Sequence, residues 1–216
     1  MPNQASARCE RLDSVVTLRR ATRHLQAADP VLRRLIEAEG PCRLRPNRAG
    51  SSFDYLVRVI LRQQISGYAA DAIEGRLRAR FGARLLPSQV LGASDATLRS
   101  LGLSRQKIGY LRDLSQKAAD GLPLGNLSRR TDEGVIEALT TVRGIGRWTA
   151  EMLLMFRLGR PDVLPVDDYG IRKAMQVAYR MRALPKPDRM RRIAEAWRPY
   201  RTVACWYLWR SLDAPK

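Results

Sequence analysis

Helical periodicity dominates the pattern of apolar and polar positions along the chain. In FDYLVRVILRQQI, the apolar residues Phe53, Leu56, Val57, Ile60 and Leu61 recur at i, i+3, i+4, i+7 and i+8, the spacing that places side chains on one face of a helix. We find no convincing alternation of apolar and polar residues of the kind typical of a strand. The sequence therefore predicts an all-α protein.

Capping and breaking residues divide the rest of the chain into further helices. ATRHLQAADPVLRRLIEAEGP predicts one or two short helices, interrupted near Asp29-Pro30 and ended by Gly40-Pro41, because proline and glycine interrupt helices. SDATLRSLGLSRQKIGYLRDLSQKAADG begins on capping residues, breaks at Gly102 and ends at Gly121. Further helices are predicted in TDEGVIEALTTV, in RWTAEMLLMFRLG, from Tyr169 onward and in PDRMRRIAEAWRPYRTVACWYLWRSL.

The charge of the chain changes this picture from a generic helical protein to one with a polyanionic partner. The 216 residues include 39 basic and 21 acidic ones, for a formal net charge of +18. Such an excess favours nucleic acid as the ligand. An arginine-rich proteome is the alternative explanation, since few of the basic residues are lysines.

Cysteine usage and hydropathy limit the compartment. Cys9, Cys42 and Cys205 are too scattered for a zinc or iron–sulfur ligand set, and an odd number without a framework suits a reducing compartment. The N-terminal MPNQASARCERLDS lacks the apolar run of a signal peptide. No stretch approaches the roughly 18 apolar residues of a membrane helix. These features predict a soluble, cytoplasmic protein without a membrane partner.

Two short motifs carry candidate chemistry. LPVDDYGIRK holds two adjacent carboxylates, Asp167 and Asp168, in a basic chain; a helix N-cap explains one Asp but not both. About twenty residues earlier, TVRGIGRWTAEM contains a G-x-G turn before a helix, where backbone amides can point at a phosphate. Alone, this turn fits a simple helix connection as well as a nucleic-acid contact.

Four motifs together resemble one protein family. VRGIGRWTAEM resembles the helix–hairpin–helix of the HhH-GPD DNA glycosylase superfamily, and LPVDDYGIRK resembles the segment that carries its catalytic aspartate. LVRVILRQQIS and LGLSRQKIGYLRDL are similar to the 3-methyladenine DNA glycosylase II (AlkA-type) branch, and the resemblance covers roughly residues 20 to 212. Little sequence precedes this core, so the chain looks like a short form without the N-terminal accessory domain of longer members.

The resemblance implies roles for individual residues. It makes Asp168 the catalytic carboxylate; because successive helical residues diverge by about 100°, we assign Asp167 to capping or anchoring the helix. Ordinary core packing competes with a base-pocket role for the aromatic residues. The implied base pocket comprises Trp148, Met152, Tyr169 and Trp209, and the implied DNA contacts are Arg143, Gly144, Ile145, Gly146, Arg147 and Thr149, with Gln64 or Ile65 as the wedge that fills the duplex after base flipping. Backbone carbonyls of Thr140, Val142 and Ile145 are the implied ligands of a monovalent cation, Na⁺ or K⁺.

Departures from the wider superfamily predict the type of enzyme. Members that also cleave the DNA strand have a Schiff-base lysine directly after the hairpin arginine, and here that position is Trp148. Members with an iron–sulfur cluster have four closely spaced cysteines near the C-terminus, where this chain has Cys205 alone. We therefore expect a monofunctional glycosylase without lyase activity and without a cluster.

The resulting hypothesis is a base-excision-repair enzyme, monomeric and acting on alkylated purines such as 3-methyladenine and 7-methylguanine in double-stranded DNA. The family implies two helical subdomains, residues 1–50 with 167–216 and residues 51–166, with the hairpin at about 140–158 and the active site in the cleft between them. Two alternatives remain open: a glycosylase for neutral lesions such as hypoxanthine or ethenoadenine, and a non-catalytic helix–hairpin–helix module that binds DNA.

Overall fold

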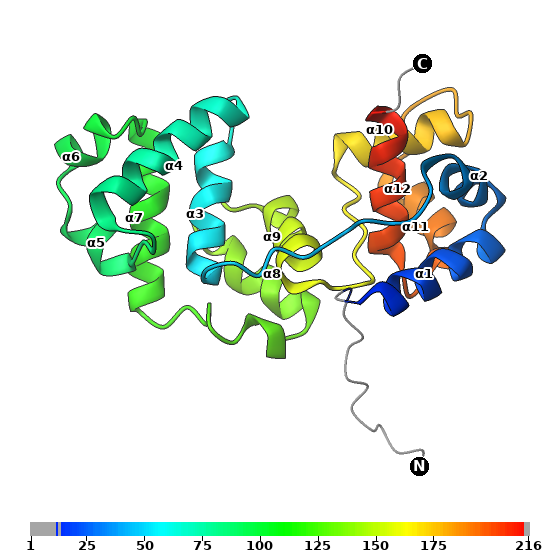
Figure 1. Ribbon diagram of the computed structural model, residues 1–216, viewed down its shortest axis with the longest axis horizontal. Coiled ribbons are helices and arrows are strands. Elements are labelled where there is room, and N and C mark those ends of the chain that lie inside the picture. The colour runs from blue at the N-terminus through cyan, green and yellow to red at the C-terminus, as the bar shows by residue number, and fades with distance from the viewer. Residues whose placement is uncertain (1–11, 13, 214–216) are drawn as a thin grey trace, which may run out of the picture. The chain divides into compact units, whose positions relative to one another are not determined.

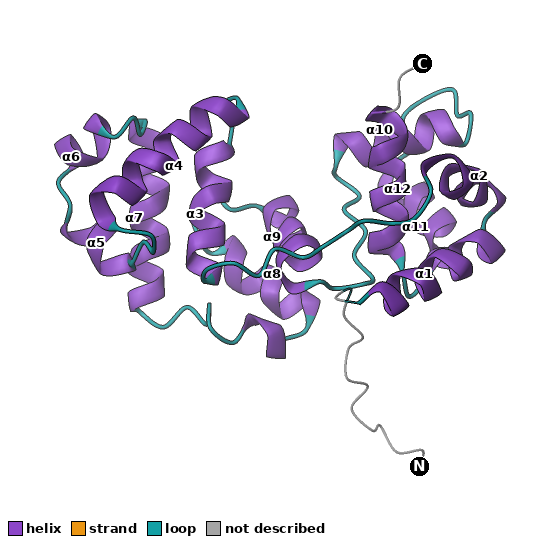
Figure 2. Cartoon of the chain, viewed as in Figure 1, coloured by secondary structure: helices purple, strands orange, loops and turns teal. Residues whose placement is uncertain are grey.

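The structure is a computed structural model that describes residue 12 and residues 14–213, so Cys9 lies outside the described residues. Every regular element in this part of the chain is helical (Figure 2). The predicted all-α class is therefore confirmed. No helix among the described residues is long and apolar enough to cross a membrane.

The chain divides into two compact units (Figure 1). Unit 1 is formed by Met1–Asn47 and Leu154–Lys216, and unit 2 by Arg48–Leu153. Unit 1 contains α1 (Val15–Ala28), α2 (Pro30–Glu39), a π-helical turn (Leu154–Leu158), α10 (Tyr169–Ala178), α11 (Pro187–Ala194), a 3₁₀ turn (Glu195–Trp197) and α12 (Arg201–Asp213). Unit 2 contains α3 (Ser52–Arg62), α4 (Gly67–Phe81), α5 (Pro87–Gly92), α6 (Asp95–Ser100), α7 (Arg105–Ala119), a 3₁₀ turn (Leu127–Arg129), α8 (Asp132–Thr140) and α9 (Arg147–Leu153).

Local signals explain where these helices begin. Asp29 caps α2 by accepting hydrogen bonds from the amides of Val31 and Leu32 at 2.8 and 3.3 Å, and Pro30 follows at the first helical position. Ser51 and Asp54 form a reciprocal capping box at the start of α3. The predicted apolar face of α3 is buried, as helical periodicity requires.

Unit 1 is built around α12, which is apolar on most sides and contacts α1, α2 and α10 (Figure 1). A buried carboxylate, Asp29, accepts hydrogen bonds from the indole of Trp197 at 2.9 Å and from the hydroxyl of Tyr179. Burial and the adjacent Asp29 raise the pKa of Tyr179 above its ordinary value. This network joins the end of α1, the end of α10 and the turn before α12.

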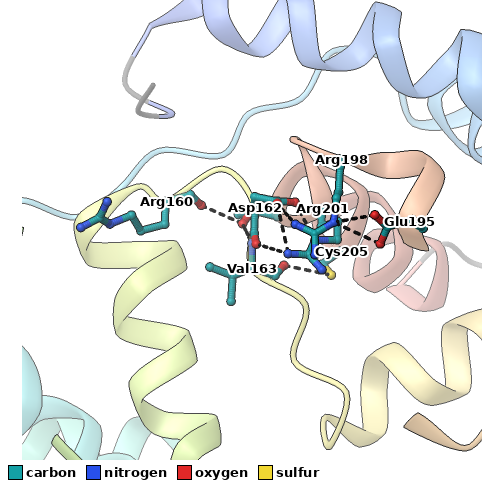
Figure 3. A network of polar contacts seen from close by, with 8 residues as sticks. Arg160, Asp162, Val163, Glu195, Arg198, Arg201 and Cys205 are labelled. Atoms are coloured by element: carbon teal, nitrogen blue, oxygen red, sulfur yellow. Dashed lines mark hydrogen bonds and ion pairs between the residues drawn. The ribbon is translucent and has the colours of Figure 1, made fainter. Parts of the chain in front are cut away.

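Both boundaries of the units differ from the predicted ones: residues 48–50 belong to unit 2, and residues 154–166 belong to unit 1. Polar contacts with α12, and with Arg198 just before it, account for the placement of residues 154–166 in unit 1. The carboxylate of Asp162 binds Arg201 at 2.6 Å and Arg198 at 2.7 Å (Figure 3). The amide of Val163 donates to Thr202 Oγ1 at 3.0 Å. These bonds connect residues far apart in sequence, so no local pattern predicts them.

Candidate active site

The acidic pair in unit 1 consists of one exposed and one half-buried carboxylate, Asp167 and Asp168. Asp168, with extended backbone angles, is the N-cap of α10, and its Oδ1 accepts a hydrogen bond from the Ile171 amide at 2.7 Å. The assignment of the cap to Asp167 was therefore wrong. Because the N-cap side chain bonds to the amide three residues later, Asp167 lies one residue too early.

A second donor fixes the same carboxylate. The indole Nε1 of Trp209, on α12, donates to Asp168 Oδ1 at 3.0 Å. The Trp209 ring is half-buried and lies 5.7 Å, between centroids, from the ring of Phe156. Two elements, the first turn of α10 and the side of α12, therefore orient the Asp168 carboxylate.

Gly170 makes this arrangement possible, although the sequence analysis did not single it out. A Cβ at this position would lie 3.0 Å from both Asp168 Oδ1 and Trp209 Nε1. Such contacts are shorter than ordinary van der Waals separations. A glycine directly inside a helix N-terminus was the signal available in the sequence.

The remaining predicted pocket residues differ in exposure. Tyr169, the first residue of α10, is 67% exposed, and Trp148, on α9 in unit 2, is 44% exposed, so both rings are accessible for stacking. Met152, also on α9, is only 8% exposed. Its backbone carbonyl accepts a hydrogen bond from Tyr55 at 3.3 Å. The side chain of Met152 therefore contributes mainly to packing.

The predicted hairpin in unit 2 connects α8 to α9. The amide of Ile145 donates to the carbonyl of Val142 at 3.1 Å, and both side chains are buried beneath the turn. Gly144 has a φ of 81°, and a Cβ there would overlap the ring of Tyr110. A Cβ at Gly146 would meet nothing within 4 Å. Of the two glycines, Gly144 is thus required by the turn itself, while Gly146 leaves open space beside the backbone.

The side chains of the hairpin divide into exposed, paired and buried ones. Arg143 is exposed at the tip. Arg147 forms a two-bond ion pair with Glu133, at 2.8 and 2.9 Å, and also contacts Glu151. Thr149 is 4% exposed, so a contact of Thr149 with a ligand would have to use its backbone amide. A phosphate-binding role therefore suits the side chain of Arg143 better than those of Arg147 and Thr149.

Side chains of helix α7 contact the hairpin and fix its position. The amide of Arg143 donates to Asp113 Oδ2 at 2.7 Å, and Lys117 binds the same carboxylate at 2.7 Å. Desolvation raises the pKa of Asp113, but the hydrogen bonds from Lys117 and Arg143 together lower it by more. The net pKa therefore lies below its ordinary value. Tyr110 packs one helical turn away, against Gly144. These positioning residues lie in the LGLSRQKIGYLRDL motif and just beyond it, but the sequence pattern alone gives no sign of their role.

The turn RQQIS, between α3 and α4, is hydrogen-bonded to the hairpin. Gln63 donates from Nε2 to the carbonyl of Gly144 at 2.9 Å. The next residue, Gln64, is exposed and has a φ of 57°, which is unusual for a residue other than glycine. Ile65 follows with 38% exposure. The two wedge candidates therefore lie at the tip of a turn that Gln63 anchors.

Comparison with known proteins shows what this architecture resembles. A profile of the HhH-GPD superfamily of base excision DNA repair proteins matches residues 57–199. DNA-3-methyladenine glycosylase 1 of Schizosaccharomyces pombe is 34% identical over 209 residues, which cover 94% of this chain and 91% of that protein.

Solved structures agree with the sequence match. A 3-methyladenine DNA glycosylase of Schizosaccharomyces pombe in complex with abasic DNA superposes with a TM-score of 0.77 at 33% identity, covering 90% of this chain and 97% of that one. A DNA-3-methyladenine glycosidase from Bacillus halodurans gives a TM-score of 0.79 at 38% identity, covering 88% of both chains.

Proposed function

The chain belongs to the HhH-GPD superfamily of base excision DNA repair proteins, and we propose that it is a DNA glycosylase that hydrolyses the N-glycosidic bond of alkylated purines in double-stranded DNA. The names of the relatives, DNA-3-methyladenine glycosylases, support 3-methyladenine as a substrate. 7-Methylguanine belongs to the same class, because alkylation at a ring nitrogen gives both bases a formal positive charge.

The carboxylate of Asp168 is the observation that carries this proposal. As the bond between base and sugar breaks, the sugar acquires oxocarbenium character, and a fixed negative charge nearby stabilises it. The bonds from Ile171 and Trp209 to Oδ1 keep the carboxylate from reorienting during this step. The same carboxylate is suited to orient or deprotonate the attacking water. A cationic base is already a good leaving group, so one carboxylate suffices.

Strand cleavage is not part of the proposed reaction. A lyase needs an amine that attacks the sugar carbon to form an imine. The residue after Arg147 is Trp148, whose indole nitrogen is not a nucleophile. With its exposed ring, Trp148 instead offers a surface suited to stacking with a flipped cationic base.

The hairpin and the RQQIS turn supply the proposed DNA contacts. The open backbone at Gly146 and the exposed Arg143 are suited to approach phosphates. Gln64, or Ile65 beside it, fills the space that the flipped nucleotide leaves.

Carbonyls of Thr140, Val142 and Ile145 would hold a monovalent cation. The carbonyl of Val142 accepts one hydrogen bond and keeps a second lone pair for such a cation. We place this activity, by a monomer, at the nucleoid in the cytoplasm.

Release of bases from methylated duplex DNA tests the proposal. The wild-type protein is expected to release 3-methyladenine and 7-methylguanine, and the DNA is expected to be nicked only after alkali treatment. Nicks without alkali would overturn the monofunctional assignment. Binding without release of methylated bases would favour the non-catalytic module, and preferential release of hypoxanthine or ethenoadenine would favour the neutral-lesion alternative.

A further inference from the structure

A basic pocket lies in unit 1 at the end of α10 that is remote from Asp168. It is a cavity of about 690 Å³ formed by the α10–α11 connection and the first turns of α11. We call this cavity the basic pocket. The cationic residues that line it are Arg180, Arg182, Lys186, Arg189 and Arg192. Helix α10 has 10 residues, so about 15 Å of helix separates this pocket from the candidate active-site carboxylate.

The wall of the basic pocket is held in place by bonds from α10. The amide of Met181 donates to the carbonyl of Gln176 at 2.8 Å, and the guanidinium of Arg172 donates to the carbonyl of Pro185 at 3.2 Å. Arg180 adopts a φ of 51° as the chain turns out of α10. Hydrogen bonds therefore hold the backbone of the α10–α11 connection in place, and its cationic side chains line the same cavity.

The charges of the basic pocket are not compensated. Its lining includes one acidic residue, Asp188, and that carboxylate binds Arg191, which is not part of the lining, at 2.8 Å. Within residues 14–213, the five cationic side chains make no recorded ion pair or hydrogen bond. Like charges gathered without counter-charges repel one another, and an anion in the pocket relieves that repulsion.

Elsewhere in the described chain, several arginines are paired with acidic residues. Examples are Arg62 with Asp71, Arg112 with Asp95, Arg147 with Glu133, Arg201 with Asp162 and Arg210 with Glu39. The basic pocket differs from these sites in lacking acidic partners.

The lining indicates which anion fits. Guanidinium groups bind phosphate oxygens through paired donors, and the volume exceeds that of one phosphate. Apart from Asp188, the remaining lining residues are small or aliphatic, and none is aromatic, so the pocket has no surface for base stacking. The chemistry thus matches the sugar–phosphate backbone of a polynucleotide and not a free nucleotide.

We propose that the basic pocket is a second, sequence-independent binding site for the backbone of duplex DNA, separate from the hairpin and from the carboxylate of Asp168. This inference rests on the proposed function in one respect, the choice of DNA as the polynucleotide. The site adds affinity for undamaged and damaged duplex alike, since phosphate contacts carry no base information.

The dependence of affinity on salt tests this site with undamaged duplex DNA, so the result does not depend on excision. The test variant is the double substitution Arg189→Gln and Arg192→Gln. The control is Arg19→Gln with Arg34→Gln, which removes the same charge from exposed positions of unit 1. The slope of log K against log salt is negative, and each lost phosphate contact reduces its magnitude by about 0.9.

The expected result for the test variant is a slope whose magnitude is smaller by about 1 to 2, with weaker binding, while the control stays close to wild type. Arg189→Lys with Arg192→Lys should retain most of the slope, because it keeps the charges. A slope equal to wild type in the Gln double variant would overturn the proposal. Equal losses in the test and control variants would overturn it as well, because net charge would then explain the effect. Failure of base release with this salt pattern intact would count against the proposed function alone.

Discussion

The indole N–H of Trp209 and the backbone N–H of Ile171 donate to the same oxygen, Oδ1, of Asp168, at 3.0 and 2.7 Å. The residue expected to provide the reacting charge is thus also the cap of its own helix. Helix α12 passes close enough for this bond because position 170 is glycine. The orientation of the carboxylate therefore depends on three residues that do not themselves ionise.

Trp209→Phe should slow excision while leaving DNA affinity unchanged. Phenylalanine keeps the contact with Phe156 but removes the donor to Asp168. A hydrogen bond to a charged group contributes about 1.5–3 kcal/mol, so we expect a single-turnover rate about 10- to 10²-fold lower. Trp206→Phe on the same helix is the matched control. Equal rates for both variants would show that the indole N–H has no role in orienting Asp168.

Gly144→Ala should destabilise unit 2 and weaken DNA binding. The left-handed φ and the overlap of a Cβ with Tyr110 both oppose any side chain at this position; we expect a loss of about 1–3 kcal/mol in the free energy of unfolding. Gly146→Ala, where a Cβ meets nothing within 4 Å, should fold normally. Denaturant unfolding measures both, and equal stabilities would contradict the account of the turn.

A second substitution separates the two causes of that loss. In Gly144→Ala with Tyr110→Ala, the overlap with the ring is removed while the unfavourable φ remains. If the overlap dominates, the double variant loses less stability than the two single losses added together. Additive losses would assign the cost to the backbone conformation alone.

Lys107→Met should impair excision with little change in stability. The buried ammonium of Lys107 donates to the carbonyl of Leu61, at the end of α3 just before the RQQIS turn. Desolvation lowers the pKa of Lys107 below its ordinary value. Burying a charge offsets much of the gain from its hydrogen bond, so the free energy of unfolding should change by about 1 kcal/mol or less.

Because this contact lies directly before the RQQIS turn, we expect the DNA affinity and the excision rate of Lys107→Met both to fall several-fold. Lys107→Arg keeps a donor at this position and should recover part of the loss. Fluorescence binding assays and single-turnover excision measure the two effects. Wild-type values for Lys107→Met would show that the turn holds its conformation without this bond.

Asp113→Asn should lower the free energy of unfolding, relative to wild type, by more at neutral pH than at acid pH. The pKa of Asp113 is lowered in the folded state, so the unfolded state binds more protons at acid pH. The stability contributed by the ionised group is therefore present above the ordinary pKa of 3.8 and is lost as the pH falls through the folded value. Urea unfolding at pH 7 and at about pH 3 should show the difference between the two proteins shrinking. A constant difference would contradict the ionic role of Asp113.

The helices could be predicted because their signals are local. The apolar spacing of α3, the Asp29-Pro30 junction and Gly144 each act within a few residues, and each has the expected place in the structure. The position of the cap at Asp168 could not be predicted, because either of the two adjacent aspartates satisfies the same pattern. Which of them is the cap depends on the residue at which the backbone becomes helical.

The supports of the site are not local. Gln63 reaches Gly144 across 81 residues, and Asp113 binds Arg143 across 30. Each of these side chains is an ordinary helix-surface residue by its sequence pattern. Only the packing of α3, α7 and the hairpin gives them a role, and a single sequence does not specify that packing. The ion pair of Arg147 with Glu133 was missed for the same reason.

The most direct test of the central claim is the single-turnover rate of 3-methyladenine release, at saturating protein, for wild type, Asp168→Asn and Asp167→Asn. Asparagine is a good N-cap, so the Asp168 variant should fold and bind DNA. The account predicts a rate about 10²-fold lower or more for Asp168→Asn and a rate close to wild type for Asp167→Asn. Equal rates for all three proteins, or a loss confined to Asp167→Asn, would contradict it.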